Sequence, residues 1–261
     1  MSNISHSYNH SPAPLERRSF LRAGLVLVAS ATIATILRPV GAAARVLMGG
    51  TKWAPRDLQP PKPVDPTKRV YFTEEEARQV TAIFDRLIPA DVLGPSASKA
   101  GCVVFTDHQL ASPWGNADYR YKDGPYLNGT PEQGYQSPLT PAQLYRLGLK
   151  DMEDHCQKKY GKSFHELSAQ EQDGCLEEIE AGKCDFPHVS SSAFFSQLLA
   201  NAQEGYFSDP VYGGNRNMAG WKMINFPGVR YDYRDVVHIK GEPIILEPVS
   251  IAQRVGPSQP I

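Results

Sequence analysis

Three stretches of this chain carry a helix-start signal directly before an apolar pattern of helical period, and this feature restricts the fold most strongly. In each stretch a Ser or Thr is followed three residues later by Glu or Gln. The two side chains of such a capping box satisfy free N–H groups of the first helical turn. The pairs are Thr73 and Glu76, Thr140 and Gln143, and Ser168 and Glu171. We therefore expect a helix to begin after each cap, with Pro141 at the first position of the second helix and Gly161 at its end.

Two further segments, 96–111 and 191–205, have apolar residues at helical spacing. In the first, Ala100, Val103, Val104 and Leu110 are expected to face the core, and the second is expected to end at Gly205. Two short β-branched runs after residue 231 predict either a small hairpin or an extended arm. The predicted fold is mainly α, with about five helices around one core, long irregular loops rich in Gly, Pro and aromatics, and a short extended C-terminal tail.

The length of 261 residues, with 21% charged and 41% hydrophobic residues, suits one folded domain, which we place at 71–261. The net charge of -1 argues against a nucleic-acid partner, which favours a basic surface. Segment 45–70 is rich in proline and has no period, so we expect an extended arm. This arm is either a solvated linker or lies across another surface.

Residues 1–44 have the pattern of an export signal. "ERRSFLR" contains Arg17, Arg18, Phe20 and Leu21, and it precedes an apolar run of 15 residues and the small residues "GAAA". The arginine pair indicates the twin-arginine (Tat) route, which exports folded proteins. The alternative is an uncleaved membrane anchor, although the run is shorter than the roughly 20 residues that span a bilayer. The expected location is the periplasm or the outer face of the inner membrane.

The four cysteines are expected to form disulfides if the chain is exported, because they are even in number and that compartment is oxidising. If the helices at 141–160 and 169–180 are antiparallel, Cys156 approaches Cys175, which makes this bridge the first choice. The alternative is a metal site with soft ligands from His155, Cys156, Cys175, Cys184 and His188. No C-x2-C pair frames such a site, so no metal is expected.

Motifs of enzymatic chemistry are absent from the sequence. Neither a Gly-rich dinucleotide fingerprint, a P-loop, a G-x-S-x-G elbow nor an H-E-x-x-H pair occurs. His108 follows Asp107 on an expected helix, where neighbours in sequence face different ways, so we interpret it as a core-edge or surface histidine. The long loop 112–138, rich in Gly, Pro and Tyr, is expected to be an ordered surface loop. We expect no catalytic and no cofactor-binding residue in this chain.

The segment "GYFSDPVYGGNRNMAGWKMINFPG", residues 205–228, has neither a helical nor a strand period. Its glycines, Asp-Pro and Pro-Gly pairs indicate frequent turns, and its aromatic residues are of the types that anchor protein interfaces. The alternative is a loop that packs its aromatics on its own core. The residues predicted to contact a partner are Tyr206, Phe207, Asp209, Pro210, Tyr212, Gly213, Gly214, Asn215, Asn217, Gly220, Trp221, Pro227 and Gly228.

With "FDRLIPAD" at 84–91 and "AGCVVFTD" at 100–107, this segment resembles the gluconate 2-dehydrogenase subunit 3 family. The resemblance extends over most of 72–228 and implies a small subunit of a membrane-bound flavin dehydrogenase. It implies FAD and the catalytic residues in a large partner subunit, haem c in a cytochrome c subunit, and a role for this chain in maturation and Tat export of the large subunit. The alternative is a stand-alone periplasmic protein that binds or oxidises a sugar between loops 114–135 and 205–228.

Overall fold

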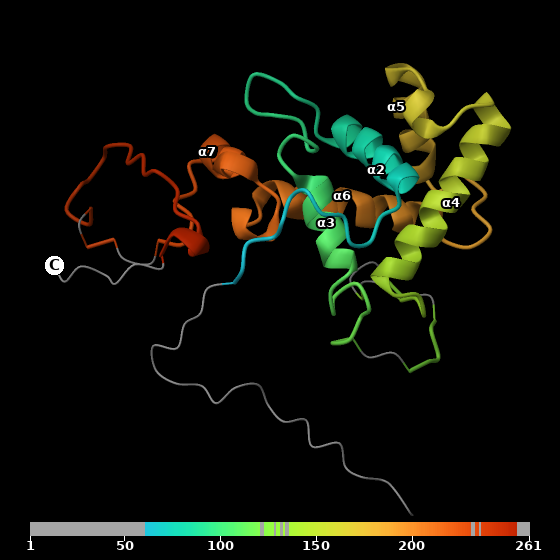
Figure 1. The fold of residues 1–261 in the computed structure, drawn as a ribbon, viewed down its shortest axis with the longest axis horizontal. Helices are drawn as coiled ribbons and strands as arrows, with labels where there is room; N and C mark the ends of the chain where they lie inside the picture. The colour runs from blue at the N-terminus through green and yellow to red at the C-terminus, as the bar shows by residue number, and fades with distance from the viewer. Residues whose placement is uncertain are drawn as a thin grey trace, which may run out of the picture. The chain divides into compact units, whose positions relative to one another are not determined.

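The computed structural model describes residues 61–120, 123–127, 129–130, 133, 136–230, 233–234 and 236–254, without the side chains of 253 and 254. All of them belong to one unit, Leu58–Ile261. The expected leader 1–44, most of the expected arm, Tyr121 and Tyr135 lie outside the described residues. The helices are α2 (Glu74–Leu87), α3 (Cys102–Leu110), α4 (Pro141–Tyr160), α5 (Ala169–Glu180), α6 (Ser191–Phe207) and α7 (Ala219–Met223), with 3₁₀ turns η2 (Phe164–Glu166), η3 (Pro210–Tyr212), η4 (Arg216–Met218) and η5 (Ile251–Arg254) (Figure 1).

The three predicted capping boxes are confirmed at the starts of α2, α4 and α5. At α2, the backbone N–H of Glu76 donates to Thr73 Oγ1 at 3.3 Å, and the N–H of Thr73 donates to Glu76 Oε2 at 2.9 Å. Helix α4 ends at Gly161, whose φ of 68° lies in the left-handed region that favours glycine. The mainly α fold class is therefore confirmed for the described residues, which include no strand.

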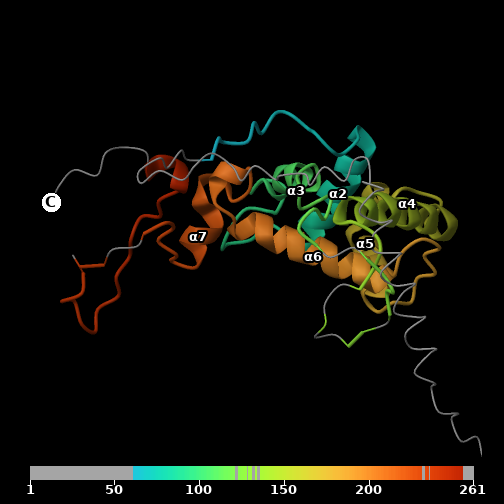
Figure 2. The same ribbon diagram turned by 90° about the horizontal axis from the view of Figure 1, so that it is seen from below.

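Helix α6 is the centre of the fold, since it contacts α2, α3, α4, α5 and α7 (Figure 2). Its buried Phe194 and Leu198 belong to the same apolar core as Phe84 of α2 and Tyr145 of α4. The Tyr145 ring is fully buried, and its hydroxyl donates to Asn201 Oδ1 of α6 at 2.9 Å. This bond satisfies the polar atom that burial of a tyrosine brings into the core.

Helix α3 is shorter than predicted, because it begins at Cys102 and not near residue 96. The preceding Gly101 has a φ of 91°, which ends any helical path through this residue. Residues before it form turns that bind α2: Ser98 donates from its backbone N–H and its hydroxyl to the carboxylate of Asp85, at 2.8 and 2.7 Å. Ala100 and Leu110 are buried as expected, whereas Val103 and Val104 are only half-buried.

The prediction that α6 ends at Gly205 is wrong, since the helix continues to Phe207. A Cβ atom at position 205 would lie 3.0 Å from the Cα atom of Cys102, so the glycine serves the close approach of α6 to α3. The segment after it was expected to lack regular structure. It contains η3, η4 and the short helix α7, the sixth α-helix of the described chain.

The described end of the proline-rich arm lies across the surface of the domain. The backbone N–H of Val64 donates to the carbonyl of Val211 at 2.9 Å. Further along, three consecutive N–H groups, those of Val70, Tyr71 and Phe72, donate to the carboxylate of Asp107 on α3 at 2.7–3.0 Å. The Asp107 side chain is buried, so its carboxylate, and not water, accepts these N–H groups and fixes the backbone that leads into α2.

The tail after residue 228 forms no hairpin among its described residues, and its one bridge joins Gly228 to Val249. Of the two predicted forms it therefore takes the extended one. Among the residues that the structure describes, no helix is both long enough and apolar enough to cross a lipid bilayer.

Candidate functional site

The segment 205–228 is held in one conformation by a buried asparagine. Asn215 has no exposed surface and a φ of 44°. Its backbone N–H donates to the carbonyl of Gly205 at 2.9 Å, its amide Nδ2 donates to the carbonyl of Ser208 at 2.9 Å, and its Oδ1 accepts the N–H of Gly220 at 2.8 Å. One side chain therefore joins the end of α6 to the start of α7.

Two aromatic residues of the segment are buried, one hydrogen-bonded within the segment and the other to the connection between α2 and α3. The indole Nε1 of Trp221 donates to the carbonyl of Phe207 at 2.8 Å, and the hydroxyl of Tyr206 donates to the carbonyl of Pro95 at 2.9 Å. Their exposed fractions are 5% and 3%. These two rings form the inner support of the segment and have almost no surface to offer a partner.

The C-terminal tail is attached to the same support through Asp209. Its carboxylate accepts the N–H of Val211 at 3.0 Å, the hydroxyl of Ser250 at 2.6 Å and the N–H of Ile251 at 2.8 Å. Next to it, the N–H of Val229 donates to the carbonyl of Val249 at 2.9 Å. The tail residues 249–251 are therefore fixed against η3 and the end of the segment.

On this support stands a set of exposed, large apolar side chains, which we name the docking surface. They are Phe207, Tyr212, Met223, Ile224 and Phe226 of the segment, and Val249 and Ile251 of the tail. Ile224 is 55% exposed, and the Phe226 ring lies edge-on against Trp221 with a centroid distance of 5.3 Å. Aromatic side chains and Met held in place in this way are typical of protein interfaces.

The predicted interface residues thus divide into two groups. Phe207, Tyr212 and Asn217 are exposed, and Asp209, Pro210 and Pro227 are half-buried. The others are buried, namely Tyr206, Gly213, Gly214, Asn215, Gly220, Trp221 and Gly228. The buried group agrees with the alternative interpretation, in which the loop packs these residues on its own core. Met223, Ile224, Val249 and Ile251 were not predicted, and only their apolar character in a polar, turn-rich context marks them in the sequence.

The sequence profile described as gluconate 2-dehydrogenase subunit 3 matches residues 74–228, more than half of the 261 residues. The chain belongs to this family. It is therefore a subunit of an oxidoreductase complex, which implies partner subunits. Searches of curated proteins and of solved structures found no match.

The region matched by the gluconate 2-dehydrogenase subunit 3 profile begins and ends at boundaries of structural elements. The match begins at the first residue of α2 and ends at Gly228, the last residue of the 205–228 segment. It therefore includes the helical core and the support of the docking surface. The tail residues Val249 and Ile251 lie beyond it, so they are a feature of this chain outside the matched region.

A second group of polar side chains lies where α4 faces α5. The predicted disulfide between Cys156 and Cys175 is not formed in this structure. Their Sγ atoms lie close together, but at 3.8 Å they are well beyond the S–S bond length of about 2.05 Å, and all four cysteines are free thiols. Burial raises the pKa of Cys102 to about 12 and that of Cys184 to about 11, so both are held as neutral thiols.

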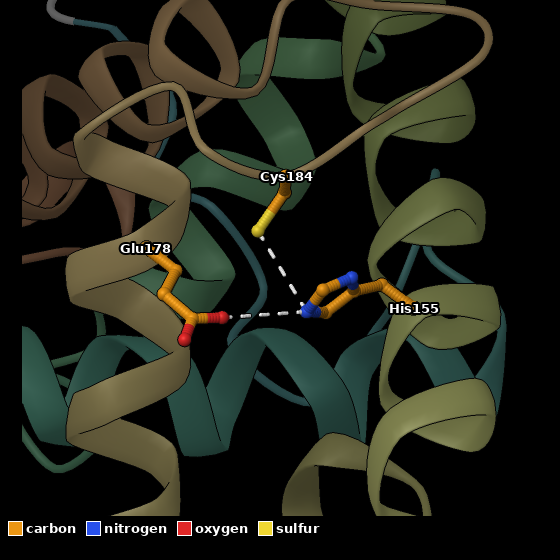
Figure 3. Close-up of side chains that lie close together, drawn as sticks. All are labelled: His155, Glu178 and Cys184. Carbon is orange, nitrogen blue, oxygen red and sulfur yellow. Dashed lines mark hydrogen bonds and ion pairs between the residues drawn. The ribbon is translucent and has the colours of Figure 1, made fainter.

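The neighbouring histidines have different surroundings. His155 Nε2 lies 3.7 Å from Cys184 Sγ and 3.8 Å from Glu178 Oε2 (Figure 3). His188 is instead bonded through Nδ1 to the fully buried carboxylate of Asp151 at 2.6 Å, so it does not join the cysteines as the alternative metal site supposed. In the sequence, Glu177, Glu178 and Glu180 have the pattern of a solvated helix face, which does not mark Glu178 as a neighbour of His155.

Proposed function

We propose that this chain is the accessory subunit that binds a large FAD-dependent dehydrogenase subunit through the docking surface. The observation that carries the proposal is the set of exposed apolar side chains standing on an otherwise buried, hydrogen-bonded support. Membership of the gluconate 2-dehydrogenase subunit 3 family supplies the class of partner. The complex would oxidise a sugar or sugar acid.

The physical argument for binding rests on pre-organisation. Asn215 and Trp221 fix α7 to the end of α6, and Asp209 fixes the tail. Ordering a mobile loop would reduce affinity, whereas a surface that is already rigid binds without that cost. Burial of Ile224 and Phe226 against a partner would then contribute to affinity without the added cost of ordering the loop.

The chemistry in this proposal belongs to the partners. FAD and the residues that react with the substrate would be in the large subunit, and haem c in a cytochrome c subunit would accept the electrons. This chain would contribute binding and folding assistance. The twin-arginine leader with Arg17 and Arg18 supports a further step, in which the assembled pair is exported to the periplasm on one signal.

Co-expression with the large flavoprotein gene tests the proposal. The tagged chain alone is expected to be colourless and inactive, and after co-expression it should carry a flavoprotein, identified by mass spectrometry and by flavin absorbance. A tagged chain that is itself yellow and oxidises a sugar would contradict the proposal and favour the stand-alone enzyme.

Removal of residues 1–44 tests the export step separately. The shortened chain should still bind the large subunit, because the docking surface is outside the leader, but both proteins should then stay in the cytoplasmic fraction. The measurement is the distribution of flavoprotein between periplasm and cytoplasm, with Arg17→Lys and Arg18→Lys together as the matched variant. A large subunit that reaches the periplasm without this leader would refute shared export and leave docking untouched.

A further inference from the structure

His155, Glu178 and Cys184 come from three different parts of the chain. His155 is on α4, Glu178 is on α5, and Cys184 is in the connection from α5 to α6 (Figure 3). Both the thiol and the carboxylate face the same ring nitrogen, Nε2. A neutral imidazole nitrogen either donates or accepts one hydrogen bond, so Nε2 can bond the thiol or the carboxylate but not both, and the carboxylate also accepts from Lys159. A cation between the three atoms would satisfy all of them.

The separations fit one tetrahedral ion. Bond lengths of about 2.3 Å for Zn–S and about 2.0–2.2 Å for Zn–N and Zn–O place the ligand atoms of a tetrahedral site about 3.4–3.6 Å apart. The sulfur and the carboxylate oxygen are 3.7 and 3.8 Å from Nε2, and all three atoms lie within 4.8 Å of one another. To close the site, the two distances to Nε2 must shorten by a few tenths of an ångström, and the sulfur–oxygen distance by up to about 1.2 Å.

We propose that His155, Glu178 and Cys184 bind a zinc ion, with water as the fourth ligand. Thiolate, imidazole and carboxylate together suit Zn²⁺, whereas Mg²⁺ and Ca²⁺ prefer oxygen ligands alone. Binding converts the Cys184 thiol to the thiolate and releases its proton to solvent. The ion would join the α5–α6 connection to both α4 and α5, which is a structural role.

The surroundings allow an ion to enter. His155 is on the wall of a surface cavity of about 440 Å³, which two acidic residues, Asp154 and Asp185, and two lysines, Lys158 and Lys159, also line. The ring of His155 is held by an edge contact with Phe186, with a centroid distance of 6.2 Å. Burial lowers the pKa of His155, which favours the neutral imidazole that binds metals.

Three lysines oppose a cation here: Lys158 acts on His155, Lys183 acts on Glu178, and Lys159 acts on both and is bonded to Glu178. The Nζ atom of Lys159 donates to both oxygens of Glu178 at 2.6 Å, and its side chain is 37% exposed. A carboxylate accepts several bonds, so Lys159 can keep Oε1 while Oε2 binds the ion. Its charge weakens binding, and Lys159→Gln should therefore increase the affinity for zinc by up to about tenfold.

The test uses the full chain without a polyhistidine tag, stripped with a chelator, kept reduced with a non-thiol reductant and titrated with Zn²⁺ alone. We expect about one equivalent to bind. Loss of an outer partner of a metal site costs about 10–100-fold in affinity, so Cys184→Ser and His155→Gln should each cost at least about 100-fold. The Co²⁺ form should show a thiolate-to-cobalt charge-transfer band that Cys184→Ser lacks.

Three matched control variants identify the ligands. His165 also lies beside a glutamate, with Nδ1 3.6 Å from Glu75 Oε1, but without a cysteine, and Cys102 is a buried thiol elsewhere. His165→Gln and Cys102→Ser should bind zinc like the wild-type chain, as should Cys156→Ser. The proposal is overturned if Cys184→Ser and His155→Gln bind zinc as tightly as the wild-type chain does. It is also overturned if neither the wild-type chain nor any variant binds zinc. Should Cys184→Ser fail to fold, the half-buried His155→Gln decides.

Discussion

Replacement of Asp107 by alanine is expected to lower the free energy of unfolding by about 4 kcal/mol. The carboxylate is 1% exposed and accepts the N–H groups of Val70, Tyr71 and Phe72. Alanine would leave the N–H of Phe72 buried without a partner and those of Val70 and Tyr71 only partly accessible to water, and a buried unsatisfied group costs about 1–3 kcal/mol. Urea unfolding followed by circular dichroism measures the change.

Two further variants calibrate this result. Asp107→Asn keeps one acceptor oxygen in the same shape, so it should lose about half as much. Asp154 on α4 has only an exposed ion pair with Lys150 at 2.5 Å, and Asp154→Ala should change stability by less than about 0.5 kcal/mol. A loss below about 1 kcal/mol for Asp107→Ala would show that water replaces the carboxylate and that the clamp does not fix α2.

The double substitution of Ile224 and Phe226 by aspartate is expected to weaken binding to the large flavoprotein subunit by at least about 100-fold. Truncation of a residue at the centre of an interface commonly costs about 2 kcal/mol or more, and two such losses with added charge exceed that factor. The side chains are 55% and 43% exposed, so the fold itself should be little affected. The measurement is affinity by surface-immobilised binding, with thermal unfolding of each variant.

Tyr119→Asp is the matched control for this pair. Tyr119 is 89% exposed in a different loop, so the same charge there should leave the affinity unchanged. Equal loss from Tyr119→Asp would place the contact elsewhere or show a general effect of charge. If the double variant binds the large subunit with unchanged affinity, the docking surface is not the site of binding.

The helices were predictable because their signals are local. A capping box marks the start of a helix within four residues, and the structure confirms this for Thr73 with Glu76 and for Ser168 with Glu171. The proximity of Cys156 and Cys175 also followed, since it needed only two neighbouring helices to pack side by side. Such features require no knowledge of distant contacts.

The form of the 205–228 segment was not predictable, because it depends on contacts far along the chain. Gly205 resembles a helix terminator, but its neighbour Cys102 in space makes it a packing glycine. In the sequence Asn215 has the pattern of a turn residue that is exposed to a partner. In the structure it is buried, and its side chain is hydrogen-bonded to Ser208 and Gly220. The sequence marks the residue types of an interface without separating the support from the surface.

The cluster around His155 could not be predicted either, because it also depends on contacts between residues far apart in the sequence. Glu178 is one of several glutamates on α5, and only the fold shows that it faces His155 while Cys184 returns toward both. Sequence spacing pointed to His188, which Asp151 holds elsewhere. Ligands drawn from two helices and a loop leave no short motif.

Hydroxyl-radical footprinting of the chain, free and bound to its large flavoprotein subunit, tests the central claim most directly. Met223 and Tyr212 are 39% and 40% exposed and should lose most of their labelling in the complex, while Tyr119 stays labelled and the buried Met152 stays unlabelled throughout. Unchanged labelling of Met223 and Tyr212 in a complex that protects other side chains would contradict docking through this surface.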